Sequence, residues 1–102
     1  MDYLLIYDYA ADYLEGRAPF RDQHLALAWA SQASGHLILA GVLANPTDGA
    51  VFHFRCDSTA PVEAFVRADP YVQHGLVTQW HIRDWVTAVG DAASNPMHPP
   101  LG

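Results

Sequence analysis

The turn Asn45-Pro46-Thr47-Asp48-Gly49 constrains the fold more than any other part of the chain. It separates two apolar segments, residues 36–44 and residues 50–56, each short enough to be a strand. An Asp-Gly pair between two such segments favours a tight reversal, because glycine tolerates the backbone angles that a hairpin turn requires. The sequence therefore predicts two antiparallel strands joined directly to each other.

Two further strands are predicted, one before this hairpin near the N-terminus and one after it. Residues 3–10 are rich in aromatic and β-branched side chains, and both of their alternating sets are largely apolar. Both faces of this strand are therefore expected to be covered. Residues 76–85 supply the last strand, and residues 11–18 are expected to form a connection.

Two helices are predicted between the strands. Pro19 suits the first turn of one helix and Gly35 its end, with an apolar stripe formed by Leu25, Ala28 and Trp29. The second helix begins after Ser58 or Thr59, with Pro61 in its first turn and a stripe formed by Val62, Phe65 and Val66. Pro70 disfavours the helical conformation for Asp69, so this helix is expected to end there.

The order strand, helix, strand, strand, helix, strand is typical of an α+β, ferredoxin-like βαββαβ fold. It places an antiparallel sheet under two helices on one face and leaves the other face bare. Because the first two strands are apolar on both sides, we expect a second subunit to cover that face and form a dimeric α/β barrel. We assign residues 1–86 to one domain and residues 87–102, rich in proline, to an irregular C-terminal extension.

Charge and cysteine content exclude several functional classes. Eleven acidic residues against five Arg and no Lys give a formal net charge of −6, the wrong sign for a protein that binds a nucleic-acid backbone. No apolar run approaches the roughly 18 residues of a membrane span, and the single Cys56 forms no internal disulfide. These features predict a cytoplasmic protein without nucleic-acid or membrane partners.

His24 and Asp69 are the candidate catalytic residues. His24 lies near the start of the first predicted helix and Asp69 at the end of the second, and both helices pack on the same sheet face in this fold. A carboxylate bonded to one imidazole nitrogen fixes the tautomer and leaves the other nitrogen free to exchange a proton near neutral pH. The alternative is that both are ordinary polar residues at helix ends.

Three spaced motifs make the chain similar to a known family. They are Arg-x-x-His-Leu at 21–25, Gly-x-Leu-x-x-x-Gly at 35–41 and Asp-Pro-Tyr-Val-x-x-Gly-Leu at 69–76, followed by Trp80 and Trp85. With these motifs the chain resembles the YCII-related (YciI-like) family of the dimeric α/β-barrel superfamily over residues 2–86. The resemblance implies a His24–Asp69 dyad as the active site, with Arg21 in the same pocket.

Four residues are candidates for substrate binding. Arg21 is able to pair with Asp69 or to hold an anionic substrate, or it forms a surface ion pair of little energetic weight. Tyr71 offers a phenolic hydroxyl, although its ring also suits packing under the last strand. Gly41 permits close approach of a ligand or marks a bulge, and His74 departs from the small or charged residue usual at this point of the family motif.

The six histidines raise the question of a metal site. None has the spacing, on a helix or beside a cysteine, that would identify metal ligands from sequence alone. His53 and His81 are nonetheless placed to align across the third and fourth strands, as the start of a ligand set. We predict no metal and no cofactor, and keep this alignment as an alternative.

The sequence thus favours a small cofactor-independent enzyme. His24 would act as acid and base, Asp69 would orient it, and Arg21 would anchor substrate charge. The family resemblance implies proton transfer or elimination on a small cyclic or phenolic metabolite, in a homodimer or larger homo-oligomer. A noncatalytic small-molecule-binding or assembly domain is the competing interpretation, because one fold hosts many functions. A cofactor-free oxygenase is a third.

Overall fold

The chain alternates strands and helices along residues 1–84, and the computed structural model describes residues 1–101. The elements are β1 (Asp2–Tyr9), α1 (Tyr13–Gly16), α2 (Ala18–Ala33), β2 (Leu37–Val42), β3 (Gly49–Arg55), α3 (Ala60–Ala68), α4 (Pro70–Gln73) and β4 (Val77–Asp84). All four predicted strands and both long helices are confirmed, with ends within about two residues. The short helices α1 and α4 were not predicted, and α1 falls in the segment expected to be a connection.

The four strands form one antiparallel sheet in the order β2-β3-β1-β4. The predicted hairpin is the β2–β3 pair, in which Val42 lies opposite Ala50. Strand β1 occupies the centre of the β3-β1-β4 ladder, so β3 and β4 are not neighbours. The alignment of His53 with His81 across the third and fourth strands is therefore not a direct pairing, because β1 lies between these strands.

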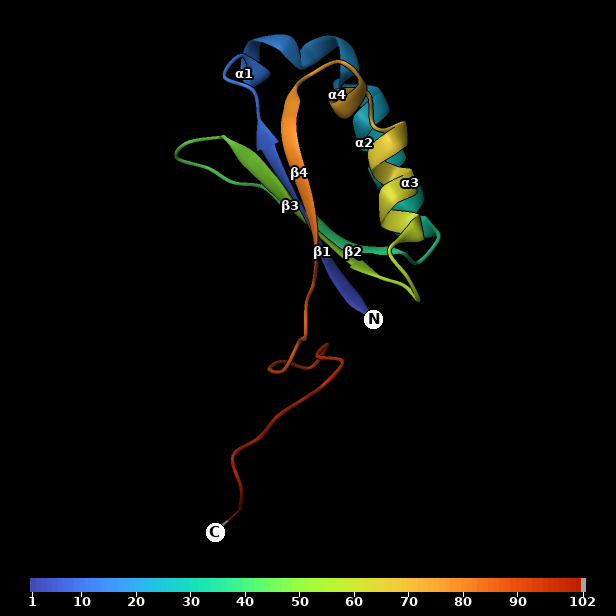
Figure 1. Cartoon of the computed structure of the whole chain (residues 1–102), viewed down its shortest axis with the longest axis vertical. Coiled ribbons are helices and arrows are strands. Elements are labelled where there is room, and N and C mark those ends of the chain that lie inside the picture. Colours follow the sequence, from blue (N-terminus) through green and yellow to red (C-terminus); the bar gives the residue numbers. More distant parts are fainter. Residues whose placement is uncertain (102) are drawn as a thin grey trace.

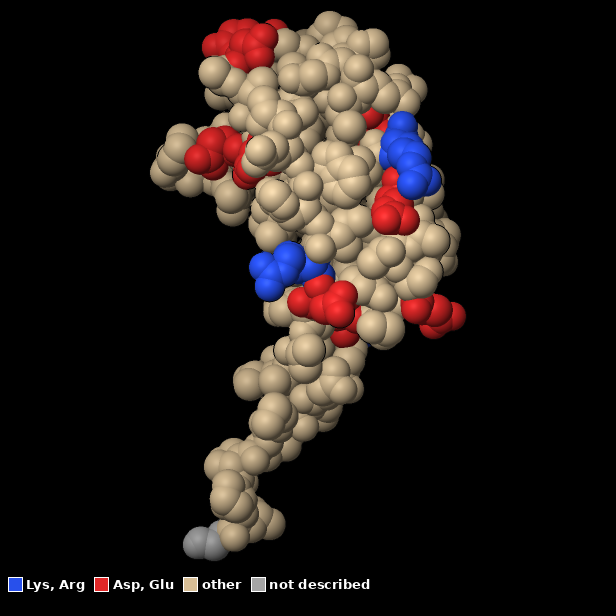
Figure 2. Space-filling view, in the orientation of Figure 1, with Lys and Arg blue, Asp and Glu red and all other residues tan. Residues whose placement is uncertain are grey.

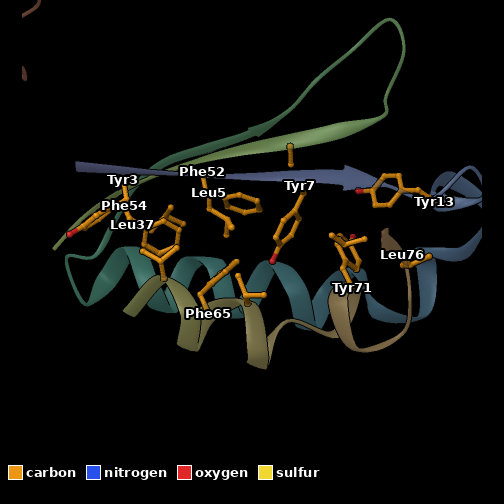
Figure 3. Close-up of a cluster of buried hydrophobic side chains, with 14 residues drawn as sticks. Tyr3, Leu5, Tyr7, Tyr13, Leu37, Phe52, Phe54, Phe65, Tyr71 and Leu76 are labelled. Carbon is orange, nitrogen blue, oxygen red and sulfur yellow. The ribbon is translucent and has the colours of Figure 1, made fainter. Parts of the chain in front are cut away.

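Helices α2 and α3 lie side by side on one face of the sheet (Figure 1). The core fills the space between the two layers, where alternate residues of β1 point toward the helices (Figure 3). Leu5 and Tyr7 from β1 and Phe54 from β3 are fully buried there. Burial of each such side chain stabilises the fold by roughly 1.5–3 kcal/mol. This packing fixes the positions of the two helices, and with them the two candidate catalytic residues.

The opposite face of the sheet carries no helix (Figure 1). Leu4 and Ile6 of β1 point to this side and remain half-buried in the single chain. In β2, Leu39 lies opposite His53 and is 73% exposed. The bare apolar face expected from the sequence is thus present.

The chain after β4 contains no helix or strand up to residue 101 and extends away from the sheet (Figure 1). Its first part folds back on itself, since the backbone N–H of Asn95 donates to the carbonyl of Thr87, and that of Met97 to the carbonyl of Ala88. Charged side chains on the face shown in Figure 2 form small separate groups on a mostly uncharged surface. Within residues 1–101, none of the helices has the length and apolarity to span a bilayer.

Candidate active site

His24 and Asp69 meet in the interior between α2 and the junction of α3 with α4. Nδ1 of His24 lies 2.9 Å from Oδ1 of Asp69. As predicted, Asp69 leaves the helical conformation before Pro70, with φ −76° and ψ 118°. This turn ends α3 and directs the carboxylate back over α4, where it caps the helix by accepting from the backbone N–H of Tyr71 at 3.0 Å.

The Asp69 carboxylate is fully buried and both of its oxygens have donors. Oδ1 accepts from His24 and from the Tyr71 backbone, while Oδ2 accepts from the hydroxyl of Tyr7 at 2.7 Å. Burial and the neighbouring Asp69 charge raise the pKa of Tyr7 far above its ordinary value, so this phenol stays protonated and donates. A buried carboxylate is tolerated when its lone pairs are satisfied in this way.

The imidazole of His24 is held by aromatic rings as well as by the carboxylate. It stacks on Tyr71 with ring centroids 4.0 Å apart and planes 11° apart, and the rings of Phe52 and Phe65 meet it edge-on. Because an ionised Asp69 accepts from Nδ1, the neutral ring carries its proton there and leaves Nε2 as the acceptor. Within residues 1–101 this nitrogen has no hydrogen-bond partner and is not sealed from solvent.

A cleft of about 300 Å³ lies between α2 and β2, and His24 forms part of its wall. We call it the α2–β2 cleft. Its lining is mostly apolar, with Leu25 and Trp29 from α2, Leu37 from β2 and Phe52 from β3. Trp29 is 68% exposed. The apolar stripe of the first helix therefore borders an open cleft at this point instead of completing the core.

The predicted binding residues are distributed unevenly around this cleft. Gly41 lines it, and a Cβ at this position would meet nothing within 4 Å. Tyr71 is buried directly against the His24 ring. Arg21 is exposed one turn before His24 and His74 stacks on Phe20 at 4.1 Å, and neither belongs to the cleft lining. The roles proposed for these four residues remain predictions.

Three further residues were not singled out from the sequence. Tyr7 binds Asp69, and Tyr9 and Gln32 are cleft-lining residues with polar side chains. Tyr7 had a visible signal, since it is a tyrosine on the β1 face that also carries the apolar residues Tyr3 and Leu5. Its partner is 62 residues away in sequence, so the pattern of one strand does not reveal the contact.

The chain contains a second pair of histidine and carboxylate outside the cleft. Nε2 of His53 lies 2.6 Å from Oδ1 of Asp2, which also accepts from Nε of Arg55 at 2.9 Å. The other oxygen of Asp2 accepts from the hydroxyls of Thr87 and Ser94. These five residues form what we call the Asp2 cluster, and it fastens the C-terminal segment to the sheet. No group of metal-binding side chains was found within residues 1–101.

The fold and this site define a small ferredoxin-like α+β protein with a buried His–Asp pair beside an apolar cleft. The chain belongs to the YCII-related domain family, whose sequence model matches residues 1–86. No curated protein matches the sequence.

Several solved structures share the fold. A 5-chloro-2-hydroxyhydroquinone dehydrochlorinase from Burkholderia phenoliruptrix, in complex with 2,5-dihydroxybenzoquinone, is 20% identical with a TM-score of 0.74, over 86% of this chain and 96% of that one. A NIPSNAP family protein from Agrobacterium tumefaciens is 14% identical with a TM-score of 0.54, over 91% and 95% of the two chains. A second protein from the same organism is 15% identical with a TM-score of 0.51, over 95% and 100%. At these identities the likeness establishes the fold.

Proposed function

We propose that the protein is a cofactor-independent enzyme that moves a proton, or eliminates a small group, on a phenolic ring bound in the α2–β2 cleft. The observation that carries this proposal is the hydrogen bond from Nδ1 of His24 to the buried Asp69, which leaves Nε2 as the acceptor of a ring that forms part of the cleft wall. A base must lie within reach of the proton it removes, and the neutral imidazole fulfils this for a ligand in the cleft.

The cleft accounts for the class of ligand. Its wall is mainly aliphatic and aromatic, and a planar ring fits beside Trp29 and Phe52. The dehydrochlorinase of the same fold acts, by its name, on a chlorinated hydroxyhydroquinone, which agrees with a ring of this kind. Arg21 remains a candidate anchor for substrate charge at the edge of the site.

The proposed reaction is a balanced proton transfer. Nε2 of His24 takes the proton from a phenolic hydroxyl and returns it to a ring carbon, while the electron pair left on the oxygen forms a carbonyl. Where that carbon carries a halide, loss of a second hydroxyl proton then expels the halide with its bonding pair, so the net loss is one proton and one halide ion. Asp69 holds the imidazole in the required tautomer and stabilises its charged form.

The test is chloride release from 5-chloro-2-hydroxyhydroquinone by wild type and by His24→Gln. Loss of a general base lowers turnover by about 10²–10⁴-fold, and we expect His24→Gln to fall in this range with its fold intact. His36→Gln, outside the cleft lining, is the matched control and retains activity. A fully active His24→Gln protein would refute the proposal.

A noncatalytic ligand-binding domain is the second candidate, favoured by the apolar lining of the α2–β2 cleft itself. It predicts tight binding of a phenolic ring without any turnover. A chlorinated hydroxyhydroquinone that binds in the cleft and is recovered unchanged would support this function over catalysis.

We also propose that the protein forms a homodimer through the bare face of the sheet. Leu4, Ile6 and Val51 of β1 and β3 are half-buried on that face, which has no helix to cover them. Ile6→Glu is expected to convert a dimer to a monomer in sedimentation velocity. Wild type that sediments as a monomer would contradict the proposal.

A further inference from the structure

Tyr9 stands out among the residues around the α2–β2 cleft because it is the one phenol in the lining. Within the described part of the chain, the polar side chains of the lining are those of His24, Tyr9 and Gln32, with the indole N–H of Trp29. Gln32 and Trp29 are exposed on α2, whereas Tyr9 is half-buried at the end of β1. The mechanism proposed above uses His24 and leaves Tyr9 without a role.

The position of Tyr9 is fixed relative to His24 by a series of aromatic contacts. Its ring stacks on Tyr13 with centroids 3.6 Å apart and planes 4° apart. Tyr13 meets Tyr71 edge-on at 5.5 Å, and Tyr71 in turn stacks on His24. The backbone N–H of Tyr9 also donates to the carbonyl of Asp48 at 2.8 Å. Tyr9 is therefore held in place before any ligand binds.

Tyr9 also has a defined protonation state. Burial, followed by the neighbouring Tyr13, raises the pKa of Tyr9 far above its ordinary value, so the hydroxyl is neutral near pH 7. A neutral phenol donates a hydrogen bond, whereas Nε2 of the neutral His24 accepts one. The cleft thus combines a donor and an acceptor with an otherwise largely apolar lining.

We propose that Tyr9 is a specificity residue that donates a hydrogen bond to a second oxygen of the phenolic ring whose first hydroxyl meets His24. This inference rests on the proposed function and narrows its substrate class to rings that carry at least two oxygen substituents. A ring with one oxygen leaves a half-buried donor unpaired, and a site built to bond a hydroxyl rejects the analogue that lacks it.

The test compares the dissociation constants of hydroquinone and phenol for three proteins by calorimetric titration. Wild type is expected to bind hydroquinone about three- to tenfold more tightly than phenol, the effect of one neutral hydrogen bond. In Tyr9→Phe the two ligands bind within about twofold of each other, because phenol affinity stays and only the extra bond is lost. Tyr3→Phe is the matched control on the same strand and sheet face, outside the cleft lining, and keeps the wild-type preference.

The outcomes separate this inference from the proposed reaction. If wild type shows no preference for hydroquinone, or binds neither ring, or if Tyr9→Phe keeps the preference, the role of Tyr9 is refuted whatever the enzyme turns over. If the preference depends on Tyr9 while His24→Gln remains fully active, the specificity role holds and the catalytic proposal fails. Thermal unfolding of Tyr9→Phe at the wild-type midpoint confirms that the change is confined to the site.

Discussion

The hydroxyl of Tyr7 lies 2.7 Å from Oδ2 of Asp69, where it is the partner of the carboxylate oxygen that His24 does not reach. In Tyr7→Phe this fully buried oxygen loses its donor. An unsatisfied buried polar group costs about 1–3 kcal/mol, so the free energy of unfolding is expected to fall by that amount in urea denaturation. Activity is expected to decrease without being abolished, because the bond between Asp69 and His24 remains.

Tyr3→Phe provides the comparison for this loss. Tyr3 shares strand and sheet face with Tyr7 and is equally buried, but its hydroxyl bonds only the sulfur of Met1, at 3.5 Å. Sulfur is a weak acceptor, so Tyr3→Phe is expected to lower the free energy of unfolding less than Tyr7→Phe does. Equal destabilisation by the two substitutions would show that the bond to Asp69 has no special weight.

The Asp2 cluster predicts a loss of stability in acid. Burial of the carboxyl raises its pKa, but the hydrogen bonds from Ser94, His53 and Arg55 outweigh burial and hold the pKa of Asp2 well below its ordinary value. The unfolded chain has a value of about 3.9. A folded-state pKa below the unfolded one stabilises the protein above that pH, and this stabilisation is lost as pH falls toward the folded-state value.

Denaturation of wild type and Asp2→Asn at a series of pH values measures this contribution. Wild type is expected to be more stable than Asp2→Asn above about pH 4, with the difference shrinking as the pH falls to about 2. Asp84→Asn, which alters an exposed carboxylate on β4 outside the Asp2 cluster, is the control. A constant gap for Asp2→Asn would mean that its carboxylate is not held by the C-terminal segment.

The elements of the fold were accessible from sequence because their signals are local. The turn at 45–49 and the prolines at 19, 61 and 70 determine where strands and helices begin and end, and the structure follows them closely. The short helix α4 was missed because Pro70 ends one helix and also suits the first turn of the next. A helix of four residues that begins with proline carries too little periodicity to be predicted.

The candidate site was accessible only in part. The approach of His24 to Asp69 followed from two helices on one sheet face, and the distance of 2.9 Å agrees with it. The pairing of Tyr7 with Asp69 and the separation of His53 from His81 depend on strand order and packing across distant segments. The cleft exists because α2 does not close fully over β2, and no residue pattern specifies such a gap.

Trp29→Ala is expected to weaken ligand binding while leaving stability almost unchanged. The indole borders the cleft and is 68% exposed, so its removal forms no cavity in the core. Surface substitutions change the free energy of unfolding by about 0.5 kcal/mol or less, whereas loss of an aromatic contact to a bound ring costs about 0.5–1.5 kcal/mol. Hydroquinone is expected to bind about two- to tenfold more weakly in calorimetric titration.

Trp80→Ala is the control for this prediction. Trp80 is 41% exposed on β4 and does not line the cleft. Its removal is expected to leave hydroquinone affinity unchanged. Equal effects of the two substitutions would place the ligand elsewhere.

Asp69→Asn tests how the carboxylate orients His24. The amide keeps the shape of the side chain but presents an NH₂ group on one side. When that group faces Nδ1, the imidazole nitrogen must accept, so the ring proton moves to Nε2 and the base toward the cleft is lost. When it faces the other way, it donates to the hydroxyl oxygen of Tyr7, while Oδ1 still accepts from the Tyr71 backbone and from Nδ1, so the ring keeps its proton there and only the negative charge is lost.

Turnover in Asp69→Asn is expected to fall by about 10²–10⁴-fold, the range of a lost general base. Nitrogen NMR of labelled His24 reports the tautomer directly: the proton lies on Nδ1 in wild type, and in the variant it moves to Nε2 when the NH₂ group faces the ring and stays on Nδ1 when that group faces Tyr7. Asp84→Asn again serves as the control and leaves both readouts unchanged. A variant that keeps its proton on Nδ1 and still loses activity would assign Asp69 an electrostatic role, in which its charge stabilises the imidazolium rather than selecting the tautomer.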